Sequence, residues 1–203
     1  MKLYITPTSP YARVARIAVL ENGLTSRIEI VEAKTRTTGS PYYAINPSGR
    51  VPYLERDGQP GLEDSQLIVA YLDALGGKAS LILPPSHADW AYGRLEANAR
   101  SFTDGLSVWV RELRRPEAER SPGIISHEVA RAKRLADVWE REIAHDVMHG
   151  ALNLAQLYLL AGLDQASYWG IATFESDRPT LGAWADALRR HPSVAATAPP
   201  PKP

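Results

Sequence analysis

Residues 8–11, Thr-Ser-Pro-Tyr, combine hydroxyl groups with the start signal of a helix. Pro10 suits the first position of a helix and Ser9 suits its N-cap. Free backbone amides and the positive end of the helix dipole meet at such a point, which favours an anion. The Ser9 hydroxyl can donate a hydrogen bond to a thiolate there. The alternative is that Ser9 only caps the helix.

A thiolate fits the energetics of this turn. A free thiol with a pKa near 8.5 is only a few per cent ionised at pH 7, and lowering that pKa by about two units requires roughly 2.7 kcal/mol. A charge-assisted hydrogen bond of about 1.5–3 kcal/mol and a dipole contribution of about 0.3–1 kcal/mol supply this amount. The chain has no cysteine, so disulfides, thiolate metal sites and a cysteine nucleophile are excluded. The thiol therefore has to come from a ligand.

Two further segments carry groups that suit a peptide-like ligand. Residues 46–52, Asn-Pro-Ser-Gly-Arg-Val-Pro, end in a proline where a strand is expected to begin. A cis bond before Pro52 would turn the N–H and C=O of Val51 toward an extended peptide, although most X-Pro bonds are trans. In the segment 62–66, Leu-Glu-Asp-Ser-Gln, Ser65 can bind a carboxylate and Asp64 an ammonium group. The pair matches an α-amino acid head group, and helix capping is again the alternative.

The elements that must position these residues have the order of a thioredoxin-like α/β domain. Alternating apolar residues predict strands, and amphipathic spacing with capping residues predicts helices. A right-handed crossover makes the first two strands parallel, and a hairpin and a helix follow, giving βαβ-ββα. The expected elements are strand 2–6, helix 10–22, strand 27–31, a hairpin of 51–55 with 61–62, and helix 65–75.

The rest of the chain is expected to form an all-α helical bundle. All of the tryptophans follow residue 86, and no strand pattern occurs there. Glycines and prolines in the stretch 76–86 indicate a boundary, which predicts domains 1–77 and 87–203 with a linker 78–86. Asn153 and Gln156 have the form of a capping box ahead of an apolar run. The expected helices are 88–115, 122–144, one that includes 157–163, and 180–190.

Composition excludes several classes of partner. The 203 residues carry no formal net charge, with a pI of about 7.0, so no global field attracts nucleic acid or acidic membranes. No apolar run is long enough to span a membrane, and no signal core begins the chain, so we expect a cytoplasmic protein. The histidines are scattered and form no ligand set, so no metal is expected; they are His87, His127, His145, His149 and His191.

Taken together, these segments resemble the glutathione transferase superfamily along nearly the whole chain. The order and spacing of the segments carry the resemblance, and the turn at Ser9 is similar to that of bacterial members with serine at the active site. The matching stretches are TSPYARVARIAVLENG, NPSGRVPYLERDG, LEDSQLIVAYLDAL, NLAQLYLLAGL and RPTLGAWADALRRHPSVAAT.

The resemblance assigns roles to individual residues. It implies that Ser9 donates to the glutathione thiolate, that the Val51 backbone pairs with the cysteinyl part, and that Pro52 follows a cis bond. Asp64 and Ser65 would bind the γ-glutamyl head. Arg50 would meet the glycyl carboxylate or, alternatively, face solvent. Asp64 stands where the family more often has glutamate, and Asn153 and Gln156 replace the usual Ser/Thr-x-x-Asp box.

For the second substrate, the resemblance implies a pocket between the domains. Tyr11 and the residues Phe102, Leu106 and Trp109 of the long helix are candidates for it, with core packing as the alternative for the last three. Tyr4 is a rival hydroxyl for the thiolate.

The expected function is conjugation of glutathione to small apolar electrophiles, as in detoxification, by a homodimer. Glutathione would be the co-substrate, and no other cofactor is expected. The alternatives are a glutathione-dependent peroxidase or thiol-disulfide reductase, and a non-catalytic module that binds glutathione or hydrophobic ligands.

Overall fold

A computed structural model describes residues 1–78, 80–82 and 90–201, which divide into two compact units. Met1–Leu83 and Ala196–Pro201 form the first unit, and Pro84–Ala195 belong to the second. The expected division placed residues 196–201 in the second domain, but they belong to the first unit. Within that unit, Arg16 Nη1 donates to the carbonyl of the buried Thr197 at 3.4 Å. Most of the expected linker 78–86 lies outside the described residues.

The first unit contains a four-stranded mixed sheet in the order β2-β1-β3-β4. β1 pairs with β2 in parallel and with β3 antiparallel, and β3 pairs antiparallel with β4. This confirms the expected βαβ-ββα order, with strand ends displaced by one or two residues. The strands are β1 (Lys2–Ile5), β2 (Glu29–Glu32), β3 (Tyr53–Arg56) and β4 (Gln59–Glu63).

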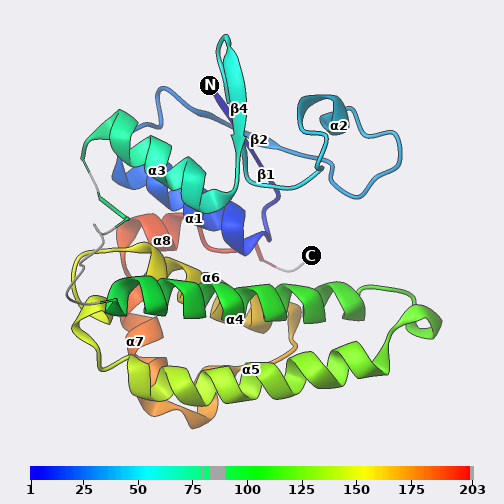
Figure 1. Cartoon of the computed structure of the whole chain (residues 1–203), viewed down its shortest axis with the longest axis vertical. Helices are drawn as coiled ribbons and strands as arrows, with labels where there is room; N and C mark the ends of the chain where they lie inside the picture. Colours follow the sequence, from blue (N-terminus) through cyan, green and yellow to red (C-terminus); the bar gives the residue numbers. More distant parts are fainter. Residues whose placement is uncertain (79, 83–89, 202–203) are drawn as a thin grey trace. The chain divides into compact units, whose positions relative to one another are not determined.

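The helices α1 (Pro10–Glu21) and α3 (Ser65–Gly76) lie side by side in this unit (Figure 1). Asn22 ties them together, because its Nδ2 donates to Ala18 O of α1 and, at 2.8 Å, to Asp73 Oδ1 of α3. The contact requires a glycine at position 76, where a Cβ would come within 2.5 Å of the Asn22 Cβ. A short helix that was not expected, α2 (Tyr42–Ile45), interrupts the connection between β2 and β3.

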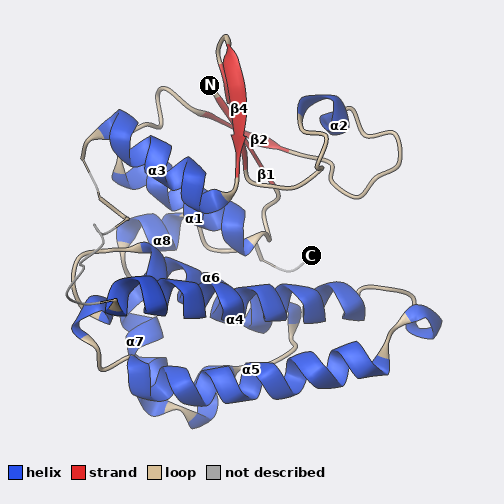
Figure 2. Ribbon diagram, viewed as in Figure 1, coloured by secondary structure: helices blue, strands red, loops and turns tan. Residues whose placement is uncertain are grey.

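The second unit is helical, and Figure 2 shows helices and loops over its described residues. Helices α5 and α7 begin and end within two residues of the expected positions, and α6 includes the expected run 157–163. Helix α4 ends two residues before its expected end, and its expected start at residue 88 lies outside the described residues. The helices are α4 (Ala91–Leu113), α5 (Pro122–Glu142), α6 (Leu154–Trp169), α7 (Pro179–Arg189) and α8 (Pro192–Ala196), with short 3-10 turns η1 (Glu117–Glu119), η2 (Asp146–Met148) and η3 (Phe174–Asp177). The last residue of α8, Ala196, is counted with the first unit.

Helix α6 is the centre of this unit, as its apolar sequence predicts. Of its 16 residues, 12 are buried, and it packs closely against α4. Gly162 permits that approach, because a Cβ there would lie 2.6 Å from Thr103 Oγ1. The Thr103 hydroxyl donates to Tyr158 O at 2.8 Å, so the close approach of the two helices also gives this buried hydroxyl a hydrogen-bond acceptor.

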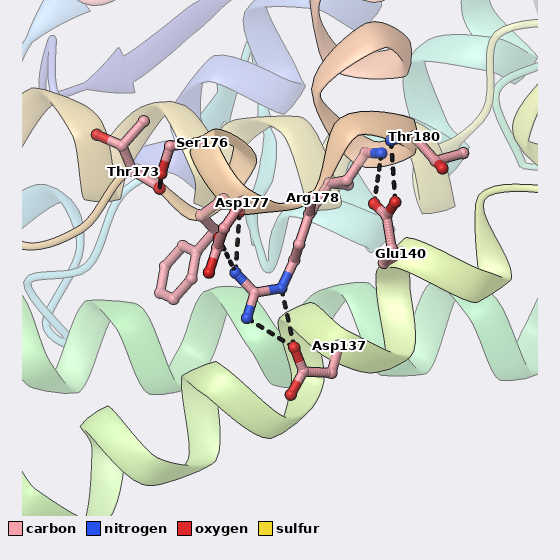
Figure 3. Close-up of polar contacts among 9 residues, drawn as sticks. Asp137, Glu140, Thr173, Ser176, Asp177, Arg178 and Thr180 are labelled. Atoms are coloured by element: carbon pink, nitrogen blue, oxygen red, sulfur yellow. Dashed lines mark hydrogen bonds and ion pairs between the residues drawn. The ribbon is translucent and has the colours of Figure 1, made fainter.

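Helix α7 takes its N-terminal cap from α5 (Figure 3). Its own N-cap residue, Arg178, makes no side-chain capping bond. Glu140 of α5 instead accepts from the backbone N–H of Thr180 at 3.0 Å and of Leu181 at 2.8 Å. Arg178 in turn donates to Asp137 Oδ1 from Nε at 3.0 Å and from Nη2 at 2.6 Å. Two carboxylates one turn apart on α5 therefore fix the start of α7.

The capping box of α6 is present, and its removal is expected to destabilise the second unit. Asn153 and Gln156 exchange bonds of 3.2 Å between side chain and backbone, and Asn153 Nδ2 also donates to the carbonyls of Val147 and Ala151. Because Asn153 is wholly buried, Asn153→Ala should cost about 2 kcal/mol of unfolding free energy. Urea denaturation measures this. The control is Ser121→Ala, which removes a single, more exposed capping bond of α5; an equal loss in the two variants would contradict the expectation.

Candidate functional site

Three segments of the first unit meet at one end of the sheet. Tyr4 near the end of β1 pairs with Tyr53 at the start of β3, and Tyr53 pairs with Glu63 at the end of β4. The chain therefore leaves β1 toward Ser9, approaches β3 through Val51, and leaves β4 toward Asp64, all from the same row of residues. The register of neighbouring strands thus brings together the three features that the sequence singled out.

Ser9 caps helix α1 and still has a hydrogen to donate. Its backbone is extended, with φ −77° and ψ 121°, and its Oγ accepts from the Ala12 N–H at 3.2 Å. The cap uses an oxygen lone pair, and among the described residues no group accepts the hydroxyl hydrogen. Capping and donation to an anion are therefore compatible functions of one hydroxyl.

The segment before β3 presents free main-chain groups. The Val51–Pro52 peptide bond is cis, which confirms the sequence-based prediction. Val51 is half-buried and Pro52 is buried. Within residues 1–78, 80–82 and 90–201, neither the N–H nor the C=O of Val51 has a hydrogen-bond partner. Both groups are available to an extended peptide lying along this edge.

Asp64 has an unusual backbone conformation at the start of α3. Its φ of 79° lies in a region that side chains other than glycine rarely adopt, and such strain is common at ligand-binding positions. Its Oδ1 caps α3 by accepting from the N–H groups of Gln66 at 2.8 Å and Leu67 at 3.3 Å. The carboxylate is exposed, so it can cap the helix and also meet a cation. Ser65 is the first residue of α3 and is buried.

Arg50 lies next to the cis bond. Its side chain is exposed, and no described residue pairs with its guanidinium. This arrangement is compatible with both sequence-based alternatives, a contact with a ligand carboxylate and simple solvation.

The expected residues of the second-substrate pocket have different environments. Tyr11 is half-buried on α1. Phe102 and Leu106 of α4 are 1% and 0% exposed, and the Phe102 ring packs against Phe174 with centroids 5.4 Å apart. Trp109 is also buried. These positions favour the packing alternative for Phe102 and Leu106, since side chains without accessible surface offer none to a ligand.

Tyr4 has its hydroxyl engaged elsewhere. The OH donates to Glu55 Oε2 at 2.8 Å, and the ring packs among Tyr42 and Tyr53, with centroids 5.4 Å and 6.5 Å away. Burial, together with the hydrogen bond to Glu55, raises the pKa of Tyr4 to about 12. Of these two hydroxyls, that of Tyr4 already donates to Glu55, whereas that of Ser9 has no acceptor among the described residues.

Sequence reasoning missed four polar residues that organise the segment before Val51. Tyr42, Asn46, Ser48 and Glu63 form connected hydrogen bonds around the peptide groups of Arg50. The sequence analysis singled out the segment 46–52 only for the proline after Val51, and the partners from α2 and β4 follow only from the fold.

The described residues contain neither a candidate metal site nor a candidate membrane span. No group of three or more His, Cys, Asp or Glu residues in that part of the chain is placed to hold a metal ion. In the same residues, no helix has the length and apolar character needed to cross a membrane.

Comparisons with known proteins agree with this fold. Residues 3–80 match the family model of the glutathione S-transferase N-terminal domain. The chain is 26% identical over 202 residues to an uncharacterised GST-like protein, YibF, of Escherichia coli K12, covering 98% of this chain and 99% of that one.

Two solved structures are similar over almost their whole length. A glutathione transferase family member from Pseudomonas fluorescens Pf-5, with bound glutathione, has a TM-score of 0.88 at 26% identity and covers 98% of this chain and 99% of its own. A glutathione S-transferase from Methylobacillus flagellatus KT, with glutathione bound, has a TM-score of 0.85 at 27% identity, with the same coverage.

The first unit thus has a thioredoxin-like fold, and a helical unit follows it. Its residues 3–80 match the glutathione S-transferase N-terminal domain, and the whole chain is similar in sequence and fold to members of the glutathione transferase family.

Proposed function

We propose that this protein is a glutathione transferase that conjugates glutathione to small apolar electrophiles in the cytoplasm. In the reaction, the sulfur of the glutathione thiolate forms a bond to the electrophilic carbon, and the leaving group departs with its electron pair. The protein binds and orients glutathione, and Ser9 stabilises the thiolate. Glutathione is the co-substrate, and no metal or other cofactor takes part.

The observation that carries this proposal is the convergence of Ser9, Val51 and Asp64 at one end of the sheet. Among the described residues, the Ser9 hydroxyl hydrogen and the N–H and C=O of Val51 have no partner, and the Asp64 carboxylate is exposed. These groups match the thiol, the peptide backbone and the ammonium group of glutathione. The bound glutathione in the Pseudomonas and Methylobacillus relatives supports this assignment of the ligand.

A panel of activities tests the reaction class. We expect glutathione-dependent turnover of a chloronitroarene, followed by the absorbance of the conjugate, and calorimetry should detect glutathione binding. Turnover of an organic peroxide without turnover of the chloroarene would replace conjugation with peroxidase activity. Glutathione binding without either turnover would identify a binding module.

We also propose that the protein is a two-fold homodimer, in which the same face of each subunit is buried. Light scattering at tens of micromolar protein is expected to give twice the 22.3 kDa mass of the chain. A monomeric mass over that range of concentration would contradict this.

A further inference from the structure

Glu63 connects two parts of the candidate glutathione site that are separate in the sequence. It is the last residue of β4, directly before Asp64. Its Oε2 accepts from Asn46 Nδ2 at 2.8 Å and from the hydroxyl of Ser48 in a short contact. One carboxylate oxygen therefore ties the turn that precedes Val51 to the strand that leads into Asp64.

The bonds continue from Glu63 to the main chain of Arg50. The Ser48 hydroxyl donates to Glu63 and accepts from the Arg50 N–H at 3.1 Å. Asn46 Nδ2 donates to the Arg50 carbonyl at 3.0 Å, and Asn46 Oδ1 accepts from the Ser48 N–H at 3.2 Å. Glu63 is thus linked to both main-chain groups of Arg50, to the N–H through Ser48 and to the C=O through Asn46.

A tyrosine completes the arrangement from the other side. The OH of the buried Tyr42 donates to the Arg50 carbonyl at 2.5 Å. The N–H and the C=O of Arg50 are therefore both hydrogen-bonded to protein side chains. The N–H and the C=O of Val51 have no partner among the described residues. The hydrogen-bond network therefore orders the main chain up to Arg50 and leaves the next residue, Val51, available to a ligand. This is the arrangement expected of residues that hold a binding segment in place.

We propose that Glu63 is a positioning residue, which holds the Val51 edge at a fixed place relative to Asp64 so that one glutathione molecule can reach both. This inference rests on the proposed function. Glu63 does not itself touch glutathione. It lowers the cost of binding because the edge is ordered before the ligand arrives.

The test compares Glu63→Ala, Glu63→Gln and a control, Glu29→Ala, which removes an exposed glutamate from the outer strand β2. Alanine removes the acceptor, whereas glutamine keeps an oxygen that can accept from both Asn46 and Ser48. Amide hydrogen exchange of residues 46–51 is measured without ligand. Calorimetry then gives glutathione affinity, and steady-state kinetics separate KM for glutathione from kcat.

In Glu63→Ala, exchange at the Ser48 and Arg50 amides is expected to be about tenfold faster. Glutathione should bind about tenfold more weakly, which corresponds to about 1.4 kcal/mol. KM for glutathione should rise while kcat at saturation stays within about twofold, because the thiolate donor Ser9 is untouched. Glu63→Gln should stay within about threefold of the wild type in every measurement, and Glu29→Ala should match it. If Glu63→Ala does not fold, Ser48→Ala breaks the same link at an exposed residue and takes its place.

Three outcomes would overturn the proposal. Unchanged exchange in residues 46–51 would show that Glu63 does not order the edge. Faster exchange with unchanged affinity would show that the order is irrelevant to binding, and equal losses in the Ala and Gln variants would exclude the hydrogen bonds as the cause. A wild-type protein that binds no glutathione would overturn the proposed function as well, which distinguishes that failure from a failure of Glu63 alone.

Discussion

Ser9→Ala is expected to raise the pKa of the bound glutathione thiol by about one to two units, and so to slow conjugation at pH 7 by about ten- to a hundredfold. The variant loses the hydrogen bond to the thiolate, and each pKa unit corresponds to about 1.36 kcal/mol. Rate should recover in part at higher pH, where the thiol ionises without help. Titration of the thiolate absorbance in the ultraviolet, with glutathione bound, reads the pKa directly.

A matched variant separates this donation from the capping function of the same hydroxyl. Ser9→Thr keeps both the capping oxygen at the start of α1 and the hydrogen to donate, so its pKa and rate should stay near those of the wild type. Identical titration curves for wild type and Ser9→Ala would show that the helix terminus or Thr8, and not Ser9, stabilises the thiolate. A slower rate in Ser9→Ala with no recovery at high pH would indicate a misplaced substrate.

Asp64→Asn is expected to weaken glutathione binding by about ten- to a hundredfold, through the loss of the negative charge that meets the γ-glutamyl ammonium group. Asparagine keeps an oxygen that can accept from the N–H groups of Gln66 and Leu67, and it tolerates a positive φ better than most residues. The variant should therefore fold with nearly the stability of the wild type. Calorimetry measures the affinity, and thermal unfolding the stability.

Two companion variants show which property of Asp64 is responsible. Asp64→Gly relieves the backbone strain at a φ of 79° but removes both cap and charge, so it should lose affinity at little cost in stability. Asp64→Ala keeps the backbone strain and removes the cap and the charge, so it should lose both glutathione affinity and stability. The buried neighbour gives a second check, since Ser65→Ala should weaken binding by roughly 1–3 kcal/mol. Undiminished affinity in Asp64→Asn and Ser65→Ala alike would move the γ-glutamyl site elsewhere.

The fold was largely predictable because its signals are local. Ser9 and Pro10 start α1, and Asn22 ends it, as their capping preferences indicate. The capping box of α6 formed as its two residues predict. Helix α2 was missed because four residues carry too little periodicity, and its place depends on burial of Tyr42 against Tyr4, which lies far away in the sequence.

For the candidate site, the sequence by itself determined the chemical groups: a hydroxyl at a helix start, a proline after Val51, and the pair Asp64 and Ser65. Residue type and local spacing determine these features. The tertiary structure decided which groups are available. Whether Ser9 keeps a free hydrogen and whether Phe102 is buried depend on residues that are distant in the sequence. The positive φ at Asp64 is a backbone torsion that the residue type does not specify. Glu63 shows the difference most clearly. It is an ordinary strand residue in the sequence, and only pairing between β3 and β4 brings it to Asn46 and Ser48, because hydrogen bonds form between groups adjacent in space.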